Sequence, residues 1–261
     1  MTTDGTMGSW SERRTRTPLT DSERILSGVL RHVREAVASD STLPGEHRLA
    51  EALGCTRQQI RHALADLENQ GIVVRRQGAA TTIDPLTLRL SARFEARVEY
   101  GDVLARMGYA PSVEVLSASF EAIPDEIAAL LHPQIDPVGA HIRLRWYADD
   151  IPAMVGQYIL PLPAGLERPF IDPTRPVFDI AHDLWSEAIA WEVVSAGVTA
   201  LTADEAEQLE QPEGEVAKMW TIVGASLDGK RISYSREVHH RDLVTYSFIR
   251  SVKEPWKIGP R

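Results

Sequence analysis

The sequence predicts an α+β protein of two domains, a small helical domain with a hairpin at the N-terminus and a larger antiparallel-sheet domain after it. Three observations support this fold class. Apolar residues recur at spacings of three and four over residues 22–67, as in amphipathic helices. Beyond residue 100, short apolar or alternating segments are separated by turn residues, as in strands joined by hairpins. The length of 261 residues suits two domains.

The formal charge is distributed unevenly along the chain. Residues 1–84 hold 11 Arg and 11 acidic residues, whereas the remaining residues hold 17 basic and 26 acidic residues. The net charge of −9 therefore belongs to the C-terminal part. Because salt screens exposed charges beyond about 10 Å, a nucleic-acid-binding domain needs a local positive face rather than a positive total charge. The acidic composition does not exclude DNA as a partner.

The composition predicts a cytoplasmic protein without a membrane span. Cys55 is the only cysteine, so no internal disulfide can form, which fits a reducing compartment. No segment approaches the ~20 continuous apolar residues that a transmembrane helix needs. Residues 1–19 are polar and lack the apolar centre of an export signal, and we interpret them as a disordered tail.

Three helices and a hairpin are predicted over residues 20–85. The first helix covers residues 22–39, and the second follows Pro44 and ends at Gly54. Thr56 is placed to cap the third helix, because its hydroxyl can accept a backbone N–H of the first turn. Two short helices joined by a turn of three or four residues form a helix-turn-helix. The inward stripe of the third helix is Ile60, Ala63, Leu64 and Leu67.

The third helix exposes residues of the kind that read base edges. Arg can contact guanine with two hydrogen bonds, Gln can do the same with adenine, and the start of a recognition helix enters the major groove. Residues 72–83 predict a hairpin with a basic first strand, which would contact DNA as a wing. Small three-helix units are also common without DNA binding, so this pattern alone leaves both functions open. The candidates are Arg57, Gln58, Gln59 and Arg61 on the helix and Arg75, Arg76, Gln77 and Gly78 in the wing.

The segment Leu43–Gly78 resembles the DNA-binding module of the GntR family of transcriptional regulators. The likeness is carried by the Leu-Pro-x-Glu start, the Thr-Arg opening of the third helix, the Arg-x-Ala-Leu that continues it and the Arg-Gln-Gly wing tip. The resemblance implies a winged helix-turn-helix that binds operator DNA. It places DNA contacts at His47, Thr56, Arg57, Gln58, Gln59, Arg61 and Gly78.

This segment departs from the family pattern at three places. His47 stands where the family usually has Arg, so this contact is expected to be weaker or sensitive to pH. Residues 78–82 lack the second glycine and the aromatic residue that usually follow the wing tip. The segment before Leu43 is a few residues shorter. These differences concern wing geometry and affinity rather than the fold.

A linker over residues 86–98 is predicted to precede a second domain over residues 99–252, with a tail over 253–261. Thr202 and Glu205 have the spacing of a capping box that begins a helix. Further helices are predicted near residues 103–107, 124–131 and 178–190. Strands are predicted near residues 113–120, 141–147, 153–160, 191–200, 215–226, 231–240 and 244–252.

This second domain resembles the UTRA effector-binding domain of the HutC-type branch of the GntR family, whose fold is similar to that of chorismate lyase. The resemblance rests on Arg143-Leu144-Arg145, the turn at residues 150–152, the hairpin at Gly229 and the segment 233–248. It implies an antiparallel-sheet α+β domain that binds a small effector and supports dimerisation.

Arg143 and Arg145 lie two residues apart on a predicted strand, so both side chains face one side of the sheet. They can form separate ion pairs with acidic residues, or together hold a carboxylate or phosphate. The UTRA resemblance favours the anion site. Glu237, His239 and Arg241 also alternate to one face of a predicted strand, where they can bind the effector, as an acidic residue near this place does in similar domains, or simply form a solvated face. Glu99, beside Tyr100, is a further effector-binding candidate.

The expected effector is a small organic acid or another anion rather than a sugar phosphate. Gly101 and Gly156 stand where amino-sugar-phosphate sensors of this branch carry a hydroxyl and an acidic residue. No catalytic set, metal site or cofactor motif is predicted. His239 and His240 are adjacent on a predicted strand and face opposite ways, and Cys55 fits a packing role.

Three functional hypotheses follow from the sequence. The leading one is a homodimeric repressor that leaves a palindromic operator when a small anionic metabolite binds. The second is a chorismate-lyase-like enzyme with a DNA-binding appendage. The third is a constitutive DNA-binding protein whose C-terminal domain only dimerises.

Overall fold

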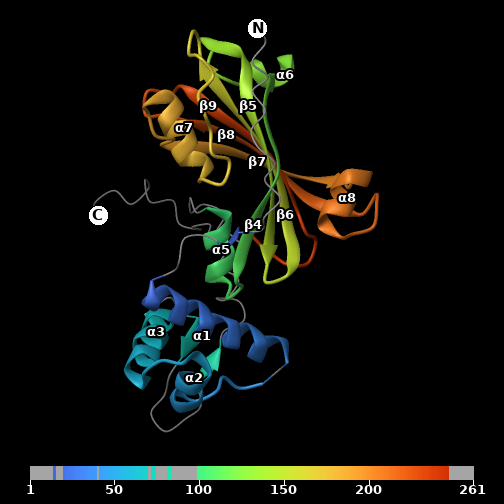
Figure 1. Cartoon of the computed structure of the whole chain (residues 1–261). Helices are drawn as coiled ribbons and strands as arrows, with labels where there is room; N and C mark the ends of the chain where they lie inside the picture. The colour runs from blue at the N-terminus through green and yellow to red at the C-terminus, as the bar shows by residue number, and fades with distance from the viewer. Residues whose placement is uncertain are drawn as a thin grey trace, which may run out of the picture. The chain divides into compact units, whose positions relative to one another are not determined.

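A computed structural model describes residues 14–15, 20–39, 41–69, 72–74, 81–83 and 99–246. Its contacts divide the chain into two compact units, a helical one within Pro18–Ala110 and a sheet-containing one that includes Pro111–Val244 (Figure 1). The α+β class predicted from the sequence is confirmed. The predicted linker at 86–98 and the predicted C-terminal tail at 253–261 lie outside the described residues. Of the predicted N-terminal tail at 1–19, only residues 14–15 are described.

The helical unit is built on three helices that enclose one apolar core. These are α1 (Asp21–Ala38), α2 (Glu46–Leu53) and α3 (Arg57–Asn69), followed by the strands β2 (Val73–Val74) and β3 (Thr82–Ile83). Helices α1 and α2 approach closely at Gly28, where an added Cβ would lie 2.7 Å from the Leu53 side chain. The fully or almost fully buried residues of this core include Ile25, Val29, Val33, Leu49, Ile60, Leu64 and Leu67.

A further helix, α5 (Tyr100–Arg106), belongs to the helical unit by its contacts. After it the chain turns at Gly108, whose φ is +85° and where an added Cβ would lie 2.4 Å from the Arg31 backbone nitrogen of α1. The Arg34 guanidinium lies 3.5 Å above the ring centroid of Tyr109. These contacts group residues 100–110 with α1, whereas the sequence placed the start of the second domain at residue 99.

The second unit contains a seven-stranded antiparallel sheet in the order β1-β4-β5-β6-β9-β8-β7. Strand β1 (Arg14–Thr15), within the segment predicted as a tail, pairs with Val113 and Ser112 of β4. The remaining strands are β4 (Pro111–Ala122), β5 (Ile135–Ala148), β6 (Ile151–Pro163), β7 (Trp191–Ala200), β8 (Val216–Ala225) and β9 (Arg231–His239).

Two helices cover opposite faces of this sheet (Figure 1). Helix α8 (Ala203–Leu209) packs through Leu209 against Val155 and Val238, and the capping box predicted at its start is present. Helix α7 (Val177–Trp185) is tied to β6 by a 2.9 Å hydrogen bond from the Trp185 indole to a backbone oxygen. The short helix α6 spans Asp125–Ala128.

Three predicted segments differ from the observed ones. The helix expected over 178–190 ends at Trp185, because Ser186 adopts the left-handed conformation with a φ of 53°. The helix expected over 124–131 is the shorter α6. Residues 244–246 of the strand expected over 244–252 are not in a strand, and the end of that segment lies outside the described residues.

Candidate functional site

The turn between α2 and α3 is fixed by both helix ends. Gly54 adopts a φ of 60° and ends α2, and its N–H donates to backbone oxygens of that helix. Thr56 begins α3, where its hydroxyl accepts from the Gln59 N–H at 3.2 Å and its own N–H donates to the Gln59 side chain at 2.9 Å. This reciprocal capping box satisfies two of the backbone N–H groups that a helix start leaves unpaired. The orientation of α3 against α2 is therefore set by local contacts.

The first two turns of α3 present polar side chains to solvent. Arg57 and Arg61 lie one helical turn apart, and their side chains are 61% and 59% exposed. Gln58 is also exposed, whereas Ile60 and Leu64 are buried in the core. Exposed Arg and Gln at the start of a helix-turn-helix recognition helix are suited to base contacts in the major groove.

Gln59 and Thr56, both predicted to contact DNA, have their side chains committed to the capping box. The Gln59 side-chain oxygen accepts from the Thr56 N–H and from its hydroxyl, both at 2.9 Å. The amide nitrogen of Gln59 is the group that remains for a contact to DNA. These two residues therefore hold the helix start in place and have less to offer to base edges than Arg57, Gln58 and Arg61.

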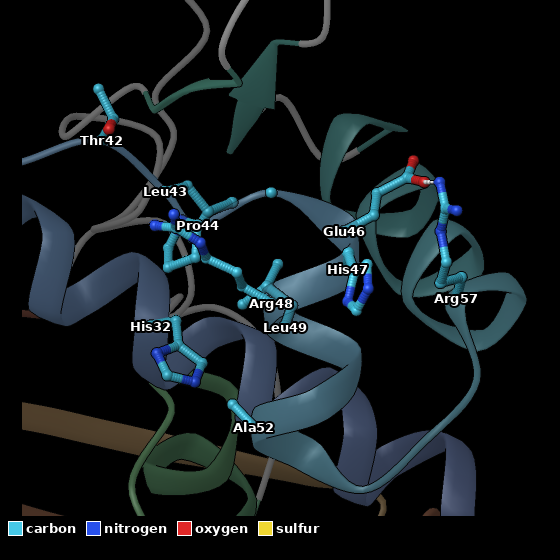
Figure 2. A pocket seen from close by; sticks show the side chains of 11 residues that line it. His32, Thr42, Leu43, Pro44, Glu46, His47, Arg48, Leu49, Ala52 and Arg57 are labelled. Carbon is cyan, nitrogen blue, oxygen red and sulfur yellow. Dashed lines mark ion pairs between the residues drawn. The ribbon is translucent and has the colours of Figure 1, made fainter.

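Glu46, which the sequence did not single out, contacts both candidate arginines. Its Oε2 atom accepts a hydrogen bond from Arg61 Nε at 2.8 Å and lies 3.8 Å from Arg57 Nη2. Figure 2 shows Glu46 at the start of α2 extending toward Arg57, beside a hollow that Thr42, Pro44 and His47 also line. The signal in the sequence was the acidic residue of the Leu-Pro-x-Glu motif.

Of the other residues predicted to contact DNA, the structure describes His47 but not the wing tip. His47 is exposed and lies 3.6 Å from Glu51 on the same helix. Strands β2 and β3 form an antiparallel pair within the predicted hairpin, with Val73 opposite Ile83. The wing candidates Arg75, Arg76, Gln77 and Gly78 lie outside the described residues.

Arg143 and Arg145 face α8, and each has an acidic partner. Arg143 forms a two-point ion pair with Asp204 in the first turn of α8. Arg145 donates to Glu114 of β4 at 2.7 Å, and Tyr147 donates to the same carboxylate oxygen at 2.8 Å. The structure therefore shows the separate ion pairs that the sequence left open as one alternative.

Glu237 and His239 lie on the opposite face of the sheet from Arg143. Register shows this, because Arg143 pairs with Gln157 of β6, whereas Glu237 pairs with the adjacent Gly156. Tyr158 donates a 3.2 Å hydrogen bond to Glu237, and the His239 ring lies 4.5 Å from the Trp220 ring, centroid to centroid. The predicted effector residues are thus divided between two faces.

Burial shifts the pKa values of this second cluster. Burial raises the pKa of Glu237 to about 7, against the opposing effect of the Tyr158 hydrogen bond. Burial also raises the pKa of Tyr158 and lowers the pKa of His239 to about 3, with the charge of Lys218 adding to the latter. Near neutral pH the imidazole of His239 is therefore uncharged, and the carboxyl of Glu237 is close to the midpoint of its titration.

The remaining effector candidates do not join either cluster. Arg241 follows the end of β9 in a turn, where its guanidinium pairs with Glu215 and Asp242. Glu99 immediately precedes α5 and lies in the helical unit. Within the described residues, no group of three His, Cys, Asp or Glu side chains is placed to hold a metal ion.

Two family matches account for both units. Residues 22–83 match the bacterial regulatory proteins of the gntR family, and residues 106–245 match the UTRA domain. The chain belongs to the GntR family and carries a UTRA domain. This GntR protein is a ligand-responsive DNA-binding transcriptional regulator, since GntR regulators bind operator DNA and UTRA domains bind small effectors. Among the helices that the structure describes, none is long and apolar enough to cross a membrane.

Curated relatives of this GntR regulator are transcription factors. It is 22% identical over 210 residues to the HTH-type transcriptional repressor NagR of Bacillus subtilis, a match covering 79% of the chain and 84% of the relative. It is 26% identical over 165 residues to the HTH-type transcriptional regulator Rv0792c of Mycobacterium tuberculosis, covering 63% of the chain and 59% of that relative.

Solved structures support the fold of both units. PhnF from Mycobacterium smegmatis is 18% identical with a TM-score of 0.54, and the match covers 85% of this chain and all of PhnF. The effector domain of PhnF, solved separately, is 16% identical with a TM-score of 0.51 and covers 59% of this chain and 95% of the domain. At this identity the likeness concerns the fold alone.

Proposed function

We propose that this regulator is a repressor that binds a palindromic operator as a homodimer and is released from it by a small anionic metabolite. The observation that carries the DNA-binding part is the exposed pair Arg57 and Arg61 at the start of α3, on a helix end fixed by the capping box of Thr56. A dimer would present two such helix ends to half-sites about one helical turn of DNA apart. The protein would act in the cytoplasm, and the proposal assigns it no catalytic step.

Selection from a duplex pool of random sequence tests the DNA-binding part. We expect the full chain to enrich a palindrome, and sedimentation of the complex to show two chains per duplex. Arg57→Ala and Arg61→Ala should each weaken binding to the enriched duplex by about 1–3 kcal/mol without lowering the melting temperature, because both side chains are exposed. Failure of the full chain to enrich any sequence would refute the proposal.

The anionic effector is proposed from the two arginines on the α8 face of the sheet, because guanidinium groups match carboxylate and phosphate geometry, and an incoming anion would replace their partners Asp204 and Glu114. A thermal-shift screen with organic acids, phosphonates and sugar phosphates would identify the ligand class. The ligand found should weaken binding to the enriched duplex by about 1–3 kcal/mol of coupling. A ligand that binds the chain and leaves DNA affinity unchanged would contradict release by an effector.

A further inference from the structure

Glu46 stands between the two arginines that the proposed function places on DNA. Its Oε2 atom accepts from Arg61 Nε at 2.8 Å and lies 3.8 Å from Arg57 Nη2. The Glu46 side chain is 27% exposed, whereas both arginines are more than half exposed. The carboxylate is thus the less exposed member of the group, and Figure 2 shows it beside the guanidinium of Arg57.

The atom that Glu46 holds decides which edge of Arg61 remains free. A guanidinium has five N–H donors in a planar fork. With Nε occupied by Glu46, the edge formed by the two terminal nitrogens has no partner within the described part of the chain. That edge can form the two parallel hydrogen bonds that guanine O6 and N7 accept. Holding the group in advance also reduces the side-chain entropy lost on binding.

The negative charge has a second consequence for binding to DNA of any sequence. Glu46 is the acidic residue in the first turn of α2, where the helix dipole stabilises an anion. A carboxylate next to Arg57 and Arg61 offsets part of their charge and repels phosphates that approach the same surface. It therefore weakens contacts with the DNA backbone, which carry no sequence information.

We propose that Glu46 is a positioning residue for sequence recognition, which directs Arg61 toward a base edge and keeps Arg57 and Arg61 from binding phosphates indiscriminately. This inference rests on the proposed function, because it requires the start of α3 to read DNA. It assigns to Glu46 an effect on discrimination between sequences rather than on affinity in general.

The test compares Glu46→Gln with Glu51→Gln, a matched control on the same helix whose carboxylate lies beside His47. Binding of each full-length variant is measured to the duplex enriched by the wild-type chain and to the random-sequence pool. Glu46→Gln should bind the random pool more tightly and lose about tenfold in the ratio of the two affinities. Glu51→Gln should keep the wild-type ratio, and repeated selection with Glu46→Gln should change the preferred base at a defined position.

A merely structural role makes different predictions. If Glu46→Gln weakens binding to both DNA samples equally, or keeps the same ratio as Glu51→Gln, the inference is wrong. Glu46→Gln should cost less discrimination in an Arg61→Ala background, where only its effect on Arg57 remains, and an unreduced loss there would overturn the link to Arg61. Should Glu46→Gln fail to fold, Glu46→Asp keeps the charge and should still alter the selected base. A wild-type chain that enriches no sequence refutes the proposed function itself.

Discussion

Tyr158 donates a 3.2 Å hydrogen bond to the buried side chain of Glu237 across the neighbouring strands β6 and β9. Gly156 makes room for this contact, because an added Cβ there would lie 2.7 Å from the Tyr158 ring. His239 lies on the same face, with its Nε2 atom 3.7 Å from Glu237 Oε2. Two buried titratable side chains with opposite pKa shifts therefore adjoin each other, and each makes a distinct prediction for stability against pH.

Glu237→Gln should remove a destabilisation that grows with pH. The folded pKa of about 7 lies above the ordinary value of 4.5, so the folded chain keeps a proton that the unfolded chain has released. The stability that the protonated Glu237 side chain gives to the folded state is fully present below pH 4.5. It is lost as pH rises through about 7. Relative to wild type, the variant should gain on the order of 3 kcal/mol across this range. Urea unfolding as a function of pH measures it.

Exposed Glu213 supplies the control for this measurement, because Glu213→Gln removes the same charge from the surface. The difference between Glu213→Gln and wild type should vary little over the same range. If the stability difference between Glu237→Gln and wild type also varies little with pH, the pKa of Glu237 is not raised in the folded chain.

His239→Gln should show the opposite dependence. Burial lowers the pKa of His239 from 6.5 to about 3, so the unfolded chain takes up a proton that the folded chain excludes. Stability from the neutral imidazole is present above pH 6.5 and is lost as pH falls toward 3. Wild type should therefore lose stability relative to His239→Gln on acidification. Exposed His47, replaced by Gln, is the control, and equal acid sensitivity of both variants would contradict the assignment.

Local features of this chain were predictable from sequence, whereas long-range pairings were not. The caps at Gly54, Thr56 and Thr202 depend on residues within a few positions, and the structure contains all three. The ion pair of Arg143 with Asp204 joins residues 61 positions apart. Alternation within one strand cannot reveal how it aligns with another strand, so the separation of Arg143 from Glu237 required the register of β5, β6 and β9.

Thr56→Ala should destabilise the helical unit and weaken sequence-specific DNA binding together. The substitution removes the hydroxyl that accepts the Gln59 N–H, which costs about 1 kcal/mol for a typical helix cap. It also frees the Gln59 side chain from one of its two contacts with Thr56. Thermal unfolding and binding to the enriched duplex measure the two effects. Thr42→Ala, at an exposed position outside the helices, should change neither, and an equal loss in both variants would argue against the cap.

Asp204→Asn should strengthen the binding of an anionic effector if Arg143 contacts that effector. Asp204 occupies both terminal nitrogens of Arg143, so an incoming carboxylate or phosphate must displace it. The two side chains are 30% and 55% exposed, so the stability change should stay within about 1 kcal/mol. Titration calorimetry with the anion found by thermal shift should show tighter binding to Asp204→Asn and none to Arg143→Gln. Unchanged affinity in both variants would make this ion pair a structural link between α8 and the sheet.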